Sequence, residues 1–106
     1  MFEQKGGMER PKPSKEQISL PLGQVVATPG ALSALTEAGI HPFTLLSRHR
    51  RGDWGDLDSE DKHLNDISVD GEGRVLSAYT LTTGERIWII TEWDRSVSTL
   101  LLPSEY

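Results

Sequence analysis

Three apolar runs rich in β-favouring residues make up the C-terminal third of the chain, at positions 74–81, 86–91 and 96–102. The polar spacers between them, at 82–85 and 92–95, have the turn-forming character expected between the strands of hairpins. The pattern therefore predicts a three-stranded antiparallel meander.

The alternation within these runs indicates a sheet that needs cover on both faces. If residues 83–84 and 93–94 form two-residue loops, Tyr79, Trp88 and Thr99 align across one face. A sheet with one face in water carries large apolar side chains mainly on the other face. Here large apolar residues occupy both sets of alternating positions: Ile87, Ile89 and Leu100 in one set, and Trp88, Ile90 and Leu101 in the other.

The N-terminal part of the chain has a different composition. Residues 1–17 combine prolines, glycines and charges with almost nothing to bury, which predicts a disordered leader. The apolar stretch 18–27 follows, and we interpret it as a fourth strand at a sheet edge, interrupted by Pro21 and Gly23.

Three short helices are predicted between this edge strand and the meander. Thr28 and Pro29 have the N-cap and first-turn character of a helix start, and Gly39 is suited to its left-handed end. A His-Pro pair at 41–42 repeats this entry and begins a second helix, which runs through the arginine-rich segment. Asp58 is positioned to cap a third helix.

The predicted elements together give an α+β fold. Three short helices pack on a C-terminal, three- to four-stranded antiparallel β-meander. Residues 18–106 form a single α+β domain, because 106 residues are enough for one modest core. Since the helices can cover only one face of the sheet, the other face suggests a dimer or a protein partner.

Composition narrows the classes of function. The chain has no cysteine, which excludes disulfides, thiolate zinc sites and cysteine nucleophiles. We expect a cytoplasmic protein with no membrane contact, because the sequence shows neither a spanning apolar run nor a signal peptide. The net charge of -5 argues against direct binding to nucleic acid, which usually needs a basic face.

The charges are unevenly distributed along the chain. Residues 48–51 read RHRR, whereas residues 52–72 contain eight acids and one lysine. This acid-rich segment favours a basic protein as the partner. We expect the binding residues in this segment, at the preceding arginine and in the 92–95 turn: Arg51, Asp53, Trp54, Asp56, Asp58, Asp61 and Asp94.

A catalytic alternative uses four other residues. His49, Glu92, Arg95 and Tyr79 are the types that a metal-independent ribonuclease uses to move protons and bind phosphate. The simpler interpretation is that cations end a helix and that Glu92 pairs with Arg95 across a turn. We therefore expect a non-catalytic protein with no cofactor and no metal site, and we keep the ribonuclease as the alternative.

The motifs also resemble those of a known family. The RH, GDWG, LSAY, WIITE, DRS and LLPSEY motifs, spread over residues 22–106, resemble small plasmid-related proteins of unknown function carried by mobile elements. Trp93 departs from the family, which has a small residue at this position.

The resemblance implies a setting for the function. Mobile elements carry small acidic proteins that block host defence enzymes, and they also carry toxin nucleases. It therefore implies an accessory protein that acts by protein–protein interaction, possible targets being a host defence or nucleic-acid-binding enzyme. A ribonuclease and a structural homodimer are the alternatives.

Overall fold

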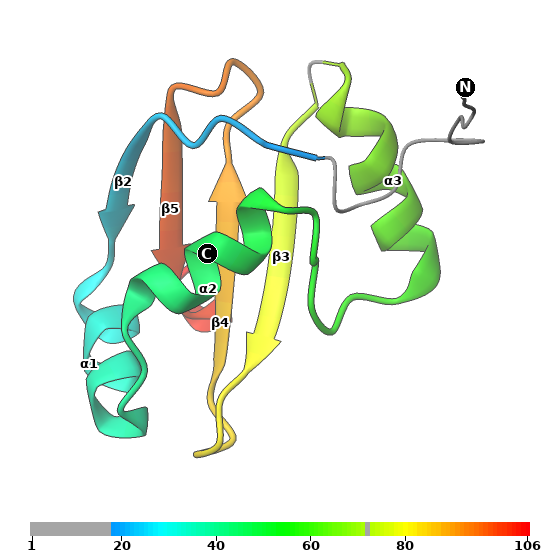
Figure 1. The fold of residues 1–106 in the computed structure, drawn as a ribbon. Coiled ribbons are helices and arrows are strands. Elements are labelled where there is room, and N and C mark those ends of the chain that lie inside the picture. Colours follow the sequence, from blue (N-terminus) through cyan, green and yellow to red (C-terminus); the bar gives the residue numbers. More distant parts are fainter. Residues whose placement is uncertain (1–17, 72) are drawn as a thin grey trace, which may run out of the picture.

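The computed structural model describes residues 18–71 and 73–106, so the predicted leader at 1–17 lies outside the described residues. It confirms an α+β fold with three helices and a four-stranded sheet (Figure 1). The elements, in chain order, are β2 (Gln24–Ala27), α1 (Pro29–Ala38), α2 (Pro42–Arg50), α3 (Ser59–Val69), β3 (Val75–Thr80), β4 (Arg86–Thr91), β5 (Val97–Leu101) and the 3-10 helix η2 (Pro103–Glu105).

The strand order is β2-β5-β4-β3, and the sheet is mixed rather than purely antiparallel. β3, β4 and β5 form the predicted meander, but β2 runs parallel to β5. The chain crosses the upper end of the sheet before it enters β2, so β2 and β5 start at the same end (Figure 1). Gly23 permits this entry, because a Cβ there would lie 2.4 Å from the carbonyl oxygens of Arg95 and Ser96.

The predicted register of the meander is wrong. Tyr79 pairs with Ile87 and not with Trp88, while Trp88 pairs with Leu101. The turns differ from the expected two-residue loops, since Leu81 and Glu92 already bond across the turns to Glu85 and Val97. Tyr79 and Trp88 therefore point to opposite faces of the sheet.

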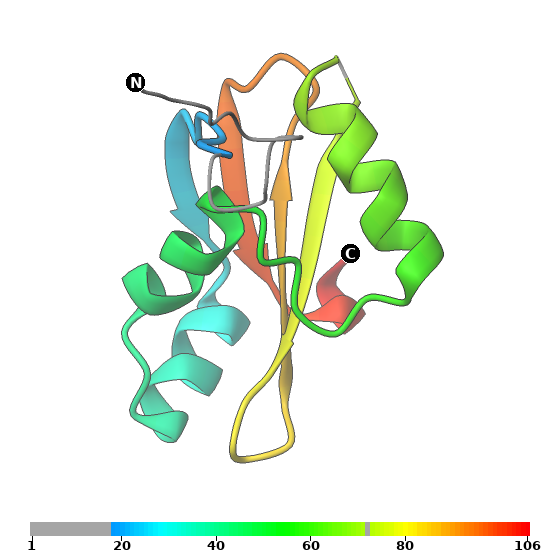
Figure 2. The ribbon, with the colours of Figure 1, turned by 45° about the vertical axis from the view of Figure 1, so that its right-hand side comes forward.

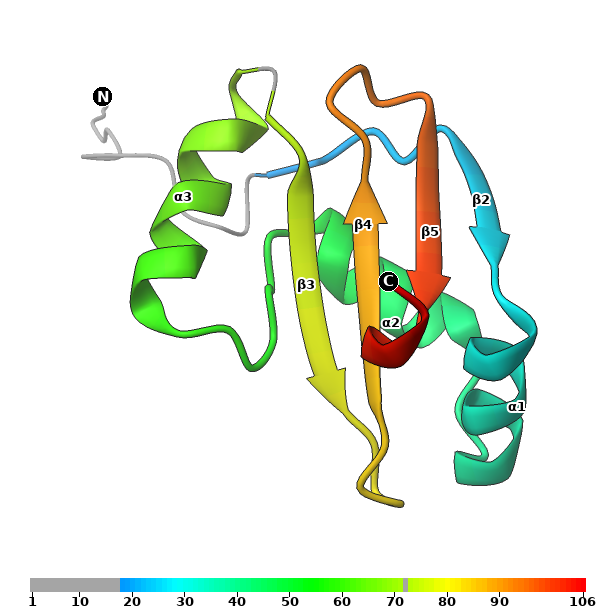
Figure 3. The same cartoon turned by 180° about the vertical axis from the view of Figure 1, so that it is seen from behind.

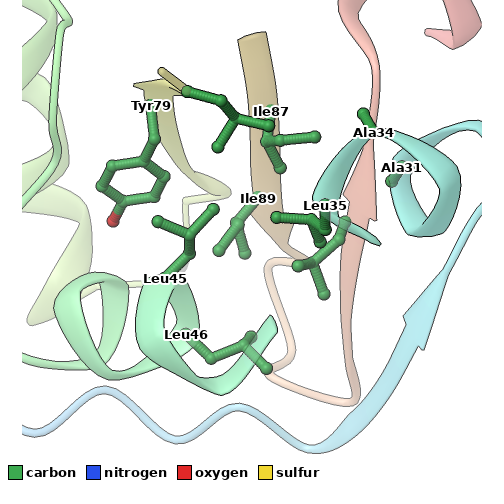
Figure 4. Packing of buried hydrophobic residues seen from close by; sticks show 10 residues of the cluster. Ala31, Ala34, Leu35, Leu45, Leu46, Tyr79, Ile87 and Ile89 are labelled. Atoms are coloured by element: carbon green, nitrogen blue, oxygen red, sulfur yellow. The ribbon is translucent and has the colours of Figure 1, made fainter. Parts of the chain in front are cut away.

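One face of the sheet, here called the front face, is covered by α1 and α2 (Figure 2). Leu35 of α1 and Leu45 of α2 pack with Ile87 and Ile89 in the main core (Figure 4). α1 has the predicted ends, because the Thr28 side chain accepts from the amide of Ala31 and the left-handed Gly39 closes the helix.

α3 lies beside the edge strand β3 and not over the centre of the sheet (Figures 1 and 2). The Asn65 side chain is inserted against β3, where it donates to the carbonyl of Leu76 and accepts from the Leu76 amide. Asp58 caps the helix as predicted. Leu64 and Ile67, the large apolar residues of this helix, are exposed and not packed on the sheet.

The opposite face of the sheet, the back face, is partly covered by the C-terminal end of the chain (Figure 3). The Tyr106 ring packs edge-on against Trp88, with the ring centroids 5.7 Å apart. Ile90 and Leu101 are buried on this face. Both faces are thus apolar, as the sequence predicts, and the segment after β5 supplies part of the second cover.

Candidate functional site

α2 turns His49, the main catalytic candidate, toward the sheet. Leu45 and His49 lie four positions apart and are both buried on the inner face of the helix. Trp54 packs edge-on against the imidazole, with the centroids 5.7 Å apart. Ser77 lies within hydrogen-bonding distance of Nδ1, and Nε2 lies 2.9 Å from the hydroxyl oxygen of Thr91.

The hydrogen bonds around His49 determine its tautomer. The Ser98 hydroxyl donates to the carbonyl oxygen of Leu22, which can only accept. Ser98 must therefore accept from the Thr91 hydroxyl, 2.7 Å away. Thr91 has then used its proton, so it accepts from Nε2–H of His49. Because burial lowers the pKa of His49, the imidazole is neutral near pH 7, and its Nδ1 then accepts from the Ser77 hydroxyl.

This environment is unsuited to acid–base catalysis. Burial lowers the pKa of His49 from 6.5 to about 4. The side chain is fully buried, whereas a general acid or base must reach the proton that it transfers. His49 therefore connects α2 to β3 and β4 through hydrogen bonds.

The structure does not bring Glu92 and Arg95 to His49. Glu92 follows Thr91, the residue that contacts His49, so its side chain points to the back face, where it lies 3.5 Å from Arg74. Arg95 has a positive φ of 61°, and its guanidinium donates to carbonyls at the end of α3 and in the following turn. The predicted Glu92–Arg95 side-chain pair is thus replaced by two separate contacts.

Tyr79, the fourth catalytic candidate, is also used internally. Its hydroxyl donates to the backbone carbonyl of Asp53 at 2.7 Å, and burial raises its pKa. The guanidinium of Arg48 lies over the ring and binds the Asp53 carboxylate at 2.7 Å. This contact with Arg48 lowers the pKa of Asp53.

Several of the predicted binding residues stabilise the loop before α3. Trp54 is only 1% exposed, and its Nε1 donates to Asp66. The Asp56 carboxylate accepts from the amide and hydroxyl of Thr80. Trp54 is therefore a core residue. It is predicted from the sequence as a binding residue, but its ring is not exposed to a partner.

The remaining predicted binding residues are at the surface. Arg51 is exposed and lies at the end of α2. Asp58 caps α3, while the carboxylate of Asp94 accepts from the amide and hydroxyl of Ser96 in the turn before β5. Asp61 is exposed in the first turn of α3.

The outer face of α3 combines acidic and large apolar side chains. Leu64 and Ile67 are 54% and 59% exposed, three positions apart and hence adjacent on the helix. Glu60 and Asp61 precede them on this face, and Asp70 follows; all three are exposed. We call these five residues the α3 face. The spacing of the apolar pair alone does not show which side of the helix meets the sheet, and the structure places both side chains in solvent.

A hollow of about 250 Å³ opens on the back face. Its lining is mostly apolar and consists of Leu76, Trp88, Ile90 and Tyr106, with Arg74 at its rim. Arg74 donates to the Tyr106 hydroxyl and pairs with Glu92, so its charge is already partnered. Besides Arg74, the polar groups of this lining are the Tyr106 hydroxyl, which already accepts from Arg74, and the Trp88 indole N–H.

The described residues form neither a metal-binding cluster nor a membrane-spanning helix. No cluster of three or more histidine, aspartate or glutamate side chains there is arranged to hold a metal ion. Within the same residues, no helix has the length and apolar character that a membrane crossing requires.

Comparisons with protein-family models, curated proteins and solved structures give no match to this chain. The resemblance to plasmid-related proteins therefore stays a prediction from the sequence motifs.

Proposed function

We propose that this chain is a non-catalytic binding protein that contacts a basic protein partner through the α3 face. The observation that carries this proposal is the exposure of Leu64 and Ile67 between acidic residues. Exposed large apolar side chains that lie next to one another on a helix are typical of interaction sites. The flanking carboxylates favour a groove with basic edges on the partner.

The way α3 is attached supports this role. The helix is held at one side by the Asn65–Leu76 hydrogen bonds and by the contact between Asp66 and Trp54. Its outer side is turned away from the sheet (Figure 2). The apolar pair can therefore enter a partner's groove without any change in the fold.

The suggested partner class follows from charge and from the motif resemblance. The exposed carboxylates of α3 have the same sign of charge as phosphate, which a nucleic-acid-binding enzyme attracts. We therefore propose a mobile-element accessory protein, located in the cytoplasm, that acts on a basic host protein such as a defence enzyme. The core position of His49 and its separation from Glu92 weigh against the ribonuclease alternative.

A homodimer through the back face has less support. Tyr106 and η2 already cover part of that face, and Ile90 and Leu101 are buried in the single chain. The α3 face has no such cover among the described residues.

Capture from a host lysate at low and high salt tests the proposal. We expect the wild-type chain to retain a basic protein at low salt and to lose most of it at high salt, since screening weakens exposed charge pairs. The Leu64→Ser/Ile67→Ser variant should fail to retain this basic protein at either salt concentration. Leu32→Ser, a matched change at an exposed leucine of α1, should behave as wild type. Equal capture by all three proteins, or no salt-sensitive partner, would contradict the proposal.

A further inference from the structure

The two edges of the sheet differ in their backbone hydrogen bonding. On the outer edge of β3, Asn65 satisfies both the amide and the carbonyl of Leu76. The amide of Ala78 donates to the carbonyl of Trp54, and its carbonyl accepts from the amide of Asp56. The Asp56 carboxylate accepts from the amide of Thr80. Most of the outward backbone groups of this edge are therefore already used within the chain.

The outer edge of β2 is open. Gln24 and Thr28 donate their amides to β5, so the amides and carbonyls of Val25 and Ala27 point away from the sheet. No hydrogen bond from the described residues reaches them, and no described element lies outside β2 (Figures 1 and 3). The strand, QVVA, also lacks the charges, prolines or bulges that usually protect an edge.

We propose that β2 is a self-association edge, at which the β2 strand of a second copy of this chain adds in antiparallel orientation. Val26 lies opposite the Val26 of the second copy, on the two-fold axis. Val25 and Ala27 of each strand then form the hydrogen-bonded pairs, because their backbone groups are the ones that point outward. The pairing is self-complementary, as a two-fold interface requires.

Exposure and charge favour a second copy as the occupant. Val25 and Val26 are 43% and 39% exposed, and the strand itself carries no charge. The acid-rich α3 lies at the β3 edge, at the far side of the sheet from β2. Two chains that join through β2 therefore keep their acidic helices at opposite ends, which limits the repulsion between two chains of charge -5.

The two Val26 side chains would face each other in this dimer, so charged variants at this position, alone and mixed, test the proposal on the full chain. We expect sedimentation equilibrium of the wild type to show a concentration-dependent mass that rises toward twice 11.8 kDa. Val26→Glu and Val26→Lys should each weaken self-association about tenfold, because like charges face each other across the pair. An equimolar mixture of the two variants should restore the heavier species.

Phe43→Glu, at an exposed apolar position of α2, is the matched control and should associate as wild type. Circular dichroism and urea unfolding check that each variant keeps the fold. A wild-type chain that stays at the single-chain mass at every concentration would overturn the proposal. So would a heavier species that Val26→Glu leaves unchanged, or a failure of the folded Glu and Lys variants to associate when mixed.

Discussion

The hydrogen bonds of His49 explain why a residue that looks catalytic in the sequence stabilises the fold. Its two ring nitrogens bind Ser77 and Thr91, and the chain continues through Ser98 to the carbonyl of Leu22. Each buried polar group has a partner, as burial requires. Burial keeps the imidazole neutral near pH 7, because it lowers the pKa of His49.

The lowered pKa of His49 predicts how stability depends on pH. The unfolded chain takes up a proton near pH 6.5, whereas the folded chain resists it until about pH 4. The contribution of neutral, buried His49 to the free energy of unfolding is complete above pH 6.5, and it is lost as the pH falls from 6.5 toward 4. The difference between the two pKa values corresponds to about 3 kcal/mol in the free energy of unfolding.

Urea unfolding of wild type and His49→Gln at pH 7.5, 6 and 5 measures this effect. His49→Gln should be less stable at pH 7.5 by about 1–3 kcal/mol, since buried hydroxyls lose a partner. It should also lose less stability on acidification than wild type does. His63→Gln, at an exposed histidine of α3, is the control, and an equal pH slope in wild type and His49→Gln would contradict the assignment.

The sequence shows residue types at this scale but not their partners. It singles out His49, yet Ser77, Thr91 and Ser98 give no signal until the inward face of each strand is known. Trp54 shows the same limit, because a tryptophan between glycines is compatible with either burial or exposure. Only the fold places it against His49 and Asp66.

At the element scale, the attachment of α3 depends on few contacts. The side chain of Asn65 makes the two backbone hydrogen bonds to Leu76 that a neighbouring strand would otherwise make. Its side-chain amide is therefore needed both as donor and as acceptor. Asn65→Asp keeps the size but removes the donor, and should destabilise the attachment by about 1–3 kcal/mol.

Hydrogen exchange tests the Asn65 contact directly. In Asn65→Asp we expect faster exchange at the Leu76 amide and in α3, while β4 and β5 change little. Asn65→Ala should show the same pattern. Unchanged protection of α3 in both variants would mean that other contacts hold the helix.

Two left-handed glycines provide a second test at this scale. Gly55 has φ +77°, and a Cβ there would lie 2.0 Å from the carbonyl oxygen of Ala78; Gly39 has φ +71° and open space. Gly39→Ala should therefore lose about 1 kcal/mol for the backbone alone. Gly55→Ala should lose about 3 kcal/mol or more, because the bridge to β3 must separate. Similar losses in the two variants, measured by thermal unfolding, would contradict the close approach.

The sequence predicts elements well where the signal is local. The caps at Thr28 and Asp58 and the end at Gly39 are decided by side chains a few residues apart, and the structure confirms them. The parallel pairing of β2 with β5 depends on where the chain crosses the sheet, and no local pattern shows this. The turn lengths, and hence the register, were missed for a related reason: loops of different length fit the same polar spacers.

At the scale of the whole molecule, the sheet separates the groups that a ribonuclease would need together. His49 and Tyr79 lie in the core on the front face, whereas Glu92 pairs with Arg74 on the back. The exposed Leu64 and Ile67 lie beside acidic residues on α3, and an open strand edge lies at the other end of the sheet. This arrangement favours binding over catalysis.

The most direct test of this account is incubation of single-stranded RNA with the purified chain in the presence of EDTA, from pH 5 to pH 8. We expect no fragments from wild type, because the imidazole of His49 is buried and lies on the opposite face of the sheet from the Glu92 carboxylate. Fragments that form with wild type and with His63→Gln, but disappear with a folded His49→Gln variant, would contradict the account and establish the enzyme.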